Sequence, residues 1–171
     1  MLRLRPYKPC DAPIIVSWCK DAESFRRWTA DRYPAFPITA EDLNRKYLEE
    51  NGDCIEADNF YPMTACDADG PVGHLILRYT DARRQIVRFG FVIVDDGKRG
   101  RGYSKEMLRL ALRYAFELLK AEKVTLGVME DNAAAYYCYR AVGFREAEQA
   151  WARTCVIDGR KYSIVEMEIE K

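Results

Sequence analysis

Histidine is almost absent from this chain, and the usual cysteine pattern of a metal site is missing with it. His74 is the only histidine among 171 residues, and no Cys-x-x-Cys pair occurs. A zinc site built from cysteine and histidine therefore has little support, and no metal is expected. Reduced thiols in a cytoplasmic protein are the simplest interpretation of the six cysteines. They are Cys10, Cys19, Cys54, Cys66, Cys138 and Cys155.

The chain also lacks an excess of charge of either sign. Its 27 Lys and Arg residues balance its 27 Asp and Glu residues. A nucleic-acid-binding domain usually carries a basic excess, so nucleic acid is not expected as a partner. No apolar run approaches the length that spans a membrane, and no signal-peptide pattern opens the sequence, so we expect no membrane association and a cytoplasmic location. The length is that of one domain, covering residues 1–171.

The order of apolar patterns predicts a mixed sheet with helices on both faces. Helices are expected near the start of the chain, with Asp11 as the cap of the first and a capping box of Thr39 and Asp42 at a later one. Short connections make most neighbouring strands antiparallel, whereas a strand that follows a long helix should be parallel to the strand before it. The expected strands are 1–7, 61–66, 72–79, 85–94, 124–129, 151–156 and 162–169.

Segment 89–119 carries the clearest chemical signal. An apolar run is followed by a basic glycine loop at 98–105 and then by a helical pattern. The first amides of a helix lack intrahelical partners, and glycines let an anion approach the backbone, so this order predicts a phosphate site. A Walker loop is excluded because no Gly-Lys-Ser/Thr is present. A Rossmann loop is weakened because Lys105 stands where its third glycine belongs, although Glu130 after the next strand keeps that alternative open.

Two motifs resemble the signatures of the GCN5-related N-acetyltransferases, the GNAT family. The first is Arg99-x-x-Gly102-x-Ser104, which is similar to the family's Arg/Gln-x-x-Gly-x-Gly/Ala loop, with Ser104 in place of Gly or Ala. The second is Asn132 followed by Tyr139 and a Gly-Phe pair, in the order and spacing of the family's last helix.

The resemblance covers essentially the whole chain. It implies an α/β (α+β) fold with a GNAT-like mixed, mostly antiparallel sheet of about seven strands and helices on both faces. The amino-terminal helices and the closing hairpin are similar to the branch of the family that includes ribosomal-protein N-terminal acetyltransferases.

The resemblance also implies where acetyl-CoA would bind. Loop amides would hold its pyrophosphate, and a bulge near Val92 would open the sheet beside it and let a backbone amide polarise the thioester carbonyl. Asn132 matches the family residue that bonds the coenzyme arm. The residues expected to bind the coenzyme are Val92, Ile93, Val94, Arg99, Gly100, Arg101, Gly102, Tyr103, Ser104, Lys105 and Asn132.

Tyr139 matches the family's general acid, and a tyrosine with an unperturbed pKa near ~10 is protonated at neutral pH. The general base has no match. Arg88 stands at one position where many family members carry a glutamate, and Gly127 stands at another. Glu130 lies nearby, but strand alternation points it to the face opposite residue 127. No base is assigned.

The aromatic residues of the first third have two interpretations. Trp28, Tyr33 and Phe36 either pack a helical cap against the sheet or, as in the resembling family, form a wall of the acceptor cleft. His74 is expected to be a partly buried strand residue with its ring hydrogen-bonded, and not a catalytic group.

The sequence therefore predicts an acetyl-CoA-dependent N-acetyltransferase that acts on a primary amine, whether a protein N-terminus, an amino sugar, a polyamine or a small metabolite. The alternative is a non-catalytic acyl-CoA-binding sensor or interaction module, which the missing glutamates permit and Tyr139 argues against. Arg88 would disfavour highly cationic acceptors if it faces the cleft. The closing hairpin would offer a sheet edge for a homodimer.

Overall fold

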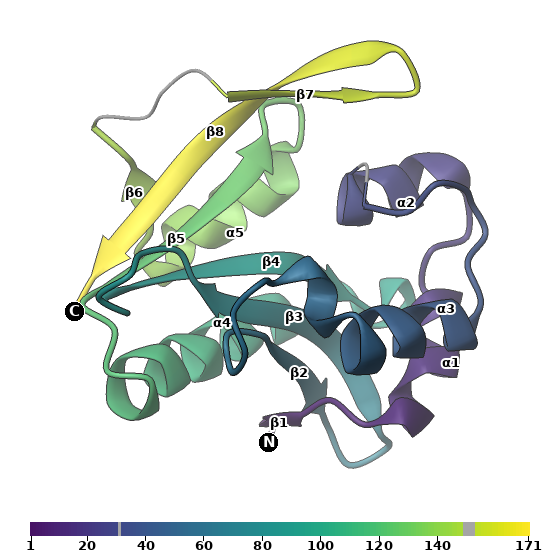
Figure 1. The fold of residues 1–171 in the computed structure, drawn as a ribbon, viewed down its shortest axis with the longest axis horizontal. Coiled ribbons are helices and arrows are strands. Elements are labelled where there is room, and N and C mark those ends of the chain that lie inside the picture. The colour runs from purple at the N-terminus through teal and green to yellow at the C-terminus, as the bar shows by residue number, and fades with distance from the viewer. Residues whose placement is uncertain (31, 149–152) are drawn as a thin grey trace.

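Eight strands form one sheet in the computed structural model, which describes residues 1–30, 32–148 and 153–171 (Figure 1). The order across the sheet is β1-β2-β3-β4-β5-β8-β6, and β7 pairs with the first part of β8. The strands are β1 (Arg3–Pro6), β2 (Tyr61–Cys66), β3 (Pro71–Tyr79), β4 (Ile86–Val94), β5 (Lys123–Met129), β6 (Arg145–Glu146), β7 (Arg153–Ile157) and β8 (Arg160–Glu170).

The strand pairing confirms the expected mixed, mostly antiparallel sheet. Strands β4 and β5 are parallel, because a long helix connects them, and the other pairs between described strands are antiparallel. The short strand β6 was not expected from the sequence. The strand expected at 151–156 is present as β7 from Arg153, and its first two residues lie outside the described part of the chain.

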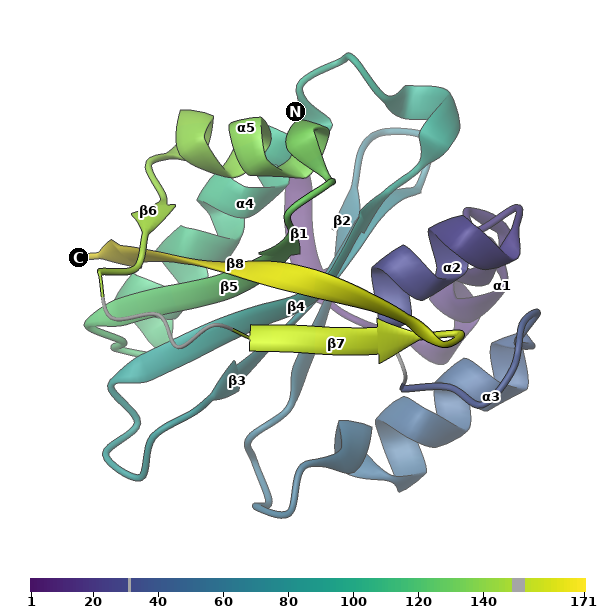
Figure 2. The same ribbon diagram turned by 90° about the horizontal axis from the view of Figure 1, so that it is seen from above.

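Five α-helices lie on the two faces of the sheet within the described residues. Figure 2 shows α4 and α5 on one face and α3, with α1 and α2, toward the other. Helices α3 and α4 each continue into a wider π-helical turn, at Arg45–Glu49 and Tyr114–Leu118. The helices are α1 (Ala12–Ser17), α2 (Ala22–Thr29), α3 (Ala40–Asn44), α4 (Tyr103–Arg113) and α5 (Ala133–Val142).

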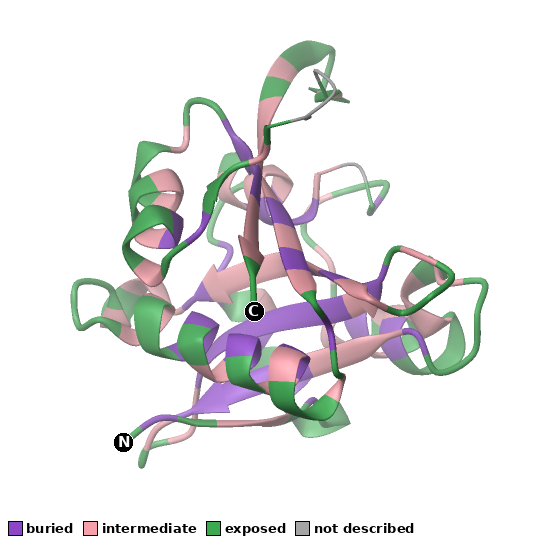
Figure 3. Ribbon diagram, turned by 90° about the vertical axis from the view of Figure 1, so that its left-hand side faces the viewer, coloured by how far each residue is buried: buried purple, intermediate pink, exposed green. Residues whose placement is uncertain are grey.

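Each face of the sheet has its own hydrophobic core. Under α4 and α5, residues such as Phe89 and Phe144 pack against the inner side of α4 at Met107 and Leu108. On the opposite face the core contains the aromatic residues of the first third of the chain. The helices accordingly bury one side and expose the other (Figure 3). The fold thus places two packed layers on either side of β4, which runs through the middle of the sheet.

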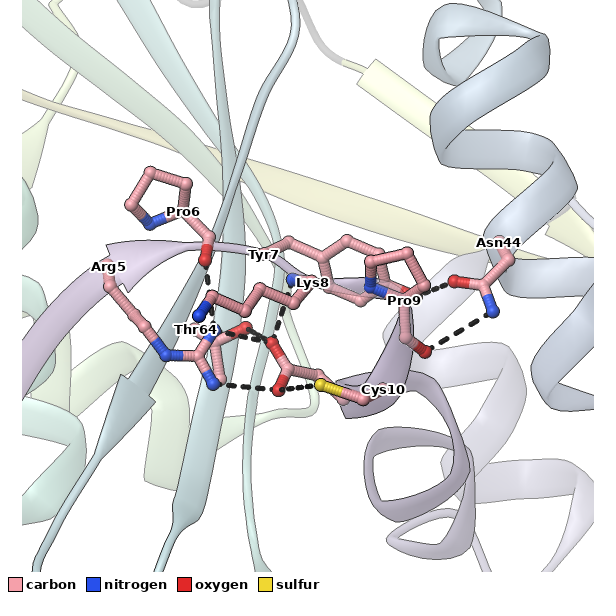
Figure 4. A network of polar contacts seen from close by, with 9 residues as sticks. Arg5, Pro6, Tyr7, Lys8, Pro9, Cys10, Asn44 and Thr64 are labelled. Carbon is pink, nitrogen blue, oxygen red and sulfur yellow. Dashed lines mark hydrogen bonds and ion pairs between the residues drawn. The ribbon is translucent and has the colours of Figure 1, made fainter.

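Asp11 does not cap α1 with its side chain, so that expectation was wrong. The carboxylate instead accepts hydrogen bonds from both Arg5 guanidinium nitrogens at 2.7 and 2.8 Å, from Thr64 Oγ1 at 2.8 Å and from the Lys8 amide at 2.9 Å. These groups lie close together in Figure 4. Asp11 is only 2% exposed, so its charge is better compensated by Arg5 than by a helix end. The capping box of Thr39 and Asp42 is confirmed.

The aromatic residues of the first third form a helical cap over the sheet, as one of the two interpretations predicted. Trp28 and Tyr33 are buried against Phe25, with ring centroids 6.3 and 5.8 Å from its ring. His74 is fully buried and not partly buried as expected. Its Nε2 lies 2.9 Å from the Tyr47 hydroxyl in a hydrogen bond, and burial lowers the pKa of His74 to about 3.

Two kinds of feature are missing from residues 1–30, 32–148 and 153–171. None of their helices is long and apolar enough to cross a membrane. No group of three histidine, cysteine or acidic side chains there is arranged to hold a metal ion.

Candidate active site

The central feature of the site is a split between β4 and β5. The two strands pair at only three positions, and the last pair joins Arg88 to Thr125. Beyond it β5 remains paired with β8, and β4 remains paired with β3. The backbone edges of β4 and β5 that face each other are thus left without strand partners, which is the arrangement that an extended polar chain can enter.

A β-bulge in β4 turns this edge toward the opening and confirms the irregularity expected near Val92. Phe91 has a φ of 51°, which is uncommon for a bulky residue, and the register with β3 shifts at this point. The indole Nε1 of Trp28 donates to the Phe91 carbonyl oxygen at 2.8 Å, and the two rings meet edge to face at 5.9 Å. Helix α2 therefore holds the bulge in place from the face opposite α4.

The basic loop that follows β4 leads into an uncapped helix. Gly102 takes the N-cap position of α4 with a φ of 81°, and Gly100 has a φ of 77°. Because Gly102 has no side chain to accept from the first amides of α4, those donors are open to an external anion. Arg99 is 69% exposed beside this helix end and forms an ion pair with Asp96.

Asp67, which sequence reasoning missed, anchors the loop. Its Oδ2 accepts from Lys98 Nζ at 2.8 Å and from the Tyr103 hydroxyl at 2.9 Å. The hydrogen bond from Lys98 lowers the pKa of Asp67 to about 2. The Tyr103 hydroxyl is thus held by the hairpin between β2 and β3, so only the backbone amide of Tyr103 is left for the coenzyme contact expected of this loop. No sequence pattern indicates that Asp67, a polar residue in a tight turn, contacts a loop about thirty residues further along the chain.

A pocket of about 380 Å³ lies at the split, along the free edge of β4. Seven of the residues expected at the coenzyme site and in catalysis line it: Val92, Ile93, Val94, Arg99, Ser104, Asn132 and Tyr139. Five expected residues do not: Gly100, Arg101, Gly102, Tyr103 and Lys105. Trp28 also lines the pocket, as the second interpretation of the aromatic residues expected. The remaining walls come from residues that the sequence analysis did not assign to the site: Trp18, Cys19, Ser24, Arg27, Leu108, Ala134, Ala135 and Cys138.

The pocket joins the two faces of the sheet. Its lining includes residues of α4 and α5 on one face and, on the other, residues of α2 together with Trp18 and Cys19, which follow α1. Arg27 of α2 is bound to Asp131, in the turn after β5, at 2.9 and 3.0 Å. This ion pair connects the walls contributed by α2 and by the start of α5.

Two polar side chains of α5 face the pocket. Asn132 is the N-cap of the helix, and its Oδ1 accepts from the Ala135 amide at 3.2 Å, so Nδ2 is the group left to donate to a ligand. Tyr139 is only 8% exposed, and its ring lies 6.2 Å from that of Phe144. Among the described residues its hydroxyl makes no hydrogen bond. Burial raises the pKa of Tyr139 above its ordinary value, so it stays protonated and able to donate at neutral pH.

Arg88 does not project as an unpaired cation. Its guanidinium binds Glu166 of β8 through two hydrogen bonds of 2.7 and 3.0 Å. Arg153 of β7 binds the same carboxylate at 2.9 Å. A Cβ atom at Gly127 would lie 2.8 Å from Arg88 Nη2, which shows that the guanidinium fills the space where a side chain of residue 127 would begin.

Comparisons with known proteins agree with this geometry. Residues 1–145 match the family model described as "Acetyltransferase (GNAT) domain". The chain belongs to the GNAT acetyltransferase family. It is 25% identical over 145 residues to spermidine N(1)-acetyltransferase of Escherichia coli K12, covering 84% of this chain and 72% of that protein. It is 29% identical over 149 residues to the uncharacterized N-acetyltransferase YokL of the Bacillus subtilis SPbeta prophage, covering 86% and 78% of the two chains.

A solved structure shares the whole fold. The spermidine N-acetyltransferase of Vibrio cholerae, in complex with CoA and spermine, superposes with a TM-score of 0.80 at 22% identity, over 99% of this chain and 95% of that one. The same Vibrio enzyme has also been described as dodecameric. The Escherichia coli and Vibrio relatives are spermidine acetyltransferases, and the expected likeness to the ribosomal-protein branch is not what the comparisons support.

Membership of the GNAT family makes the protein an acetyl-CoA-dependent N-acetyltransferase. The sequence departs from the family pattern at two positions. The positions that carry a glutamate in many members are Arg88 and Gly127, and here the first side chain occupies the space next to the second. The two substitutions therefore form one structural unit with Glu166 from the adjacent strand.

Proposed function

We propose that acetyl-CoA enters the split from the face covered by α4 and α5 and that Tyr139 completes acetyl transfer to a primary amine. The observation that carries this proposal is the pocket of about 380 Å³, which reaches from the first turn of α4 through the split to the Tyr139 side chain. The residues present fit the coenzyme, because an uncapped helix start, exposed Arg99 and an unpaired strand edge meet along one path.

In this proposal the pyrophosphate lies against the amides of residues 100–105 with Arg99 and Arg101 beside it. The pantetheine amides pair with the free edge of β4 at residues 92–94, and the Nδ2 group of Asn132 donates to the same arm. Glycines 100 and 102 serve by their backbone alone, which explains why they lie outside the pocket lining. Tyr103 and Lys105 contribute amides and not side chains.

Bound acetyl-CoA supplies a thioester whose carbonyl carbon accepts the nucleophile. The neutral amine nitrogen attacks this carbon, the new C–N bond forms, and the C–S bond breaks. The leaving sulfur takes its proton from the Tyr139 hydroxyl, the proton lost by the amine passes to solvent, and solvent returns a proton to Tyr139 before the next turnover. The buried, protonated hydroxyl of Tyr139 favours this enzymatic role over the alternative of a non-catalytic acyl-CoA sensor.

The acceptor reaches the split from the other face. With coenzyme on the α4 side, the amine would approach from the side of α2, where Arg27 and Trp28 line the pocket. The Escherichia coli relative is named for acting on spermidine, and the Vibrio relative was solved with spermine; both compounds are primary amines. Self-association is also part of the proposal, because the Vibrio enzyme is dodecameric and the hairpin here exposes Val156.

The test combines binding with turnover. Calorimetry should detect acetyl-CoA binding to the full chain, and CoA release should follow when primary amines are added. Binding without release for any amine in a panel of polyamines, amino acids, amino sugars and N-terminal peptides would favour the sensor. Absence of acetyl-CoA binding would remove both functions.

A further inference from the structure

Three arginines form a row across the face of the sheet opposite α4. Arg78 of β3 and Arg88 of β4 are direct cross-strand partners. Each alternates along its strand with residues that are buried in the core under α4, so both side chains project to the other face. Arg153 of β7 extends the row, because it binds the Glu166 carboxylate that also binds Arg88.

This row carries more positive than negative charge. Arg88 and Arg153 share one carboxylate, and among the described residues no carboxylate lies within ion-pair distance of Arg78. Arg78 is half-buried, and burial, together with the nearby cations Arg32 and Arg88, lowers the pKa of Arg78. Arg88 and Arg153 thus contact one carboxylate, and Arg78, which hydrogen-bonds Cys54, adds a third positive charge opposite Arg88. Positive charge removed from water without a counter-ion favours the binding of an anion.

The row lies at the foot of the split. The β4–β5 pairing ends at Arg88, and the guanidinium of that residue crosses the opening to Gly127 on β5 and Glu166 on β8. The amine acceptor approaches from the same face, since the coenzyme takes the other. The three arginines lie outside the pocket lining but at the foot of the same split, so an acceptor that extends from the pocket along this face reaches them.

We propose that the acceptor is a primary amine that also carries an anionic group, a carboxylate or a phosphate-like group, which binds the row of Arg78, Arg88 and Arg153. This inference rests on the proposed function of the split. Guanidinium groups recognise such anions through paired hydrogen bonds, and Arg153, at 58% side-chain exposure, has donors available to a ligand. A polyamine would instead bring a second cation against the row. The substrate class of the spermidine acetyltransferases would then not extend to this chain.

The first experiment compares acceptors of similar length at saturating acetyl-CoA. They are 4-aminobutanoate, 3-aminopropylphosphonate, butylamine and 1,4-diaminobutane. We expect kcat/KM for one or both anionic amines to exceed that for butylamine and 1,4-diaminobutane by about 10-fold or more. Arg153→Glu should remove that preference. Arg145→Glu is the matched control, because it makes the same charge change on an arginine of similar exposure at β6, and it should retain the preference. A wild type that prefers 1,4-diaminobutane overturns the inference.

The second experiment does not depend on turnover. Butanoate and propylphosphonate, which lack the amine, are titrated by NMR into the CoA-loaded protein. We expect shifts of arginine side-chain signals that disappear in Arg153→Glu and persist in Arg145→Glu. The anion that binds more tightly distinguishes carboxylate from phosphate-like recognition. No shift with either anion overturns the inference even if amines are acetylated. Binding of an anion without acetylation of any amine removes the proposed function and leaves the anion site standing.

Discussion

Arg88 and Glu166 join two strands that are not neighbours in the sheet. Arg88 lies on β4 and Glu166 on β8, and their two hydrogen bonds of 2.7 and 3.0 Å cross β5 at Gly127. The pair thereby bridges the foot of the split, where backbone pairing between β4 and β5 ends. Only a glycine on β5 allows this bridge, because a Cβ atom there would lie 2.8 Å from the guanidinium and 2.9 Å from Ile164 Cγ2.

Removing the negative charge of this bridge should destabilise the fold. In Glu166→Gln two arginines lose their shared carboxylate, and the side chains concerned are 12% exposed for Glu166 and 18% for Arg88. We expect the free energy of unfolding to fall by about 1–3 kcal/mol, less than for a fully buried pair because some solvent remains. Urea denaturation measures the change. The control Glu117→Gln breaks an exposed pair with Arg113 on α4 and should cost less than about 0.5 kcal/mol. Equal losses in the two variants would show that the bridge adds nothing to stability.

Gly102→Val should reduce the affinity for acetyl-CoA while the protein remains folded. The positive φ of 81° strains any larger residue, and the valine side chain would stand where we place the pyrophosphate. We expect at least about a 10-fold loss of acetyl-CoA affinity, or about 1.4 kcal/mol, by calorimetry. Gly159→Val is the matched control, because Gly159 has a φ of 78° and equally open surroundings at the tip of the β7–β8 hairpin. A Gly102→Val protein that folds and binds acetyl-CoA like the control would exclude the loop as the pyrophosphate site.

His74 should give the stability curve a slope at mildly acidic pH. Its pKa is lowered to about 3 in the folded state by burial, whereas an unfolded histidine titrates near ~6.5. Below pH ~6.5 the unfolded chain binds a proton at His74, whereas the folded chain does not. The free energy of unfolding therefore falls as the pH falls, by about 1.4 kcal/mol per pH unit, until the pH reaches the pKa of the folded state. Urea titrations from pH 6.5 to 5, above the range where most carboxylates titrate, should show this slope in wild type.

Because His74 is the only histidine of the chain, substituting it tests whether it causes the slope. His74→Gln should lose the slope, and Tyr47→Phe, which removes the hydrogen-bond partner but keeps the buried ring, should retain it. An unchanged slope in His74→Gln would assign the pH dependence to other groups.

The sequence predicted the parts of this structure that depend on local rules. The strand-loop-helix order of 89–119 and the capping box at Thr39 follow from backbone preferences within a few residues, whereas the bulge near Val92 was implied by the family resemblance; all three are present. The two signatures correctly brought Ser104, Asn132 and Tyr139 to one pocket.

What could not be predicted depends on pairs that are distant in the chain. Arg88 and Glu166 are 78 residues apart, and no local pattern indicates that an arginine at one former glutamate position would take up the space at the other. Asp67 lies in the short connection between β2 and β3, where local rules indicate only a turn, yet it anchors Lys98 and Tyr103. Asp11 satisfied the local rule for a helix cap, but a buried carboxylate binds more favourably to a nearby guanidinium.

Tyr139→Phe should reduce turnover and leave the coenzyme bound. The change keeps the ring that packs near Phe144 and deletes the hydroxyl, which has no other hydrogen-bond role among the described residues. If that hydroxyl protonates the leaving sulfur, kcat should fall by roughly 100-fold or more with little change in acetyl-CoA affinity. Tyr137→Phe is the control on the same helix, because Tyr137 is 70% exposed and should have no effect.

The pH profile adds an independent readout. No positioned carboxylate is assigned as the base, and a free alkyl amine titrates near ~10.4, so kcat/KM of wild type should climb from pH 7 to 9 as more amine becomes neutral. Burial raises the pKa of Tyr139, so its ionisation should not reverse that climb within this range. A Tyr139→Phe enzyme with undiminished kcat, where the chemical step limits turnover, would return Tyr139 to a packing role, and a flat profile above pH 6 would point to an enzyme base that the described structure does not reveal.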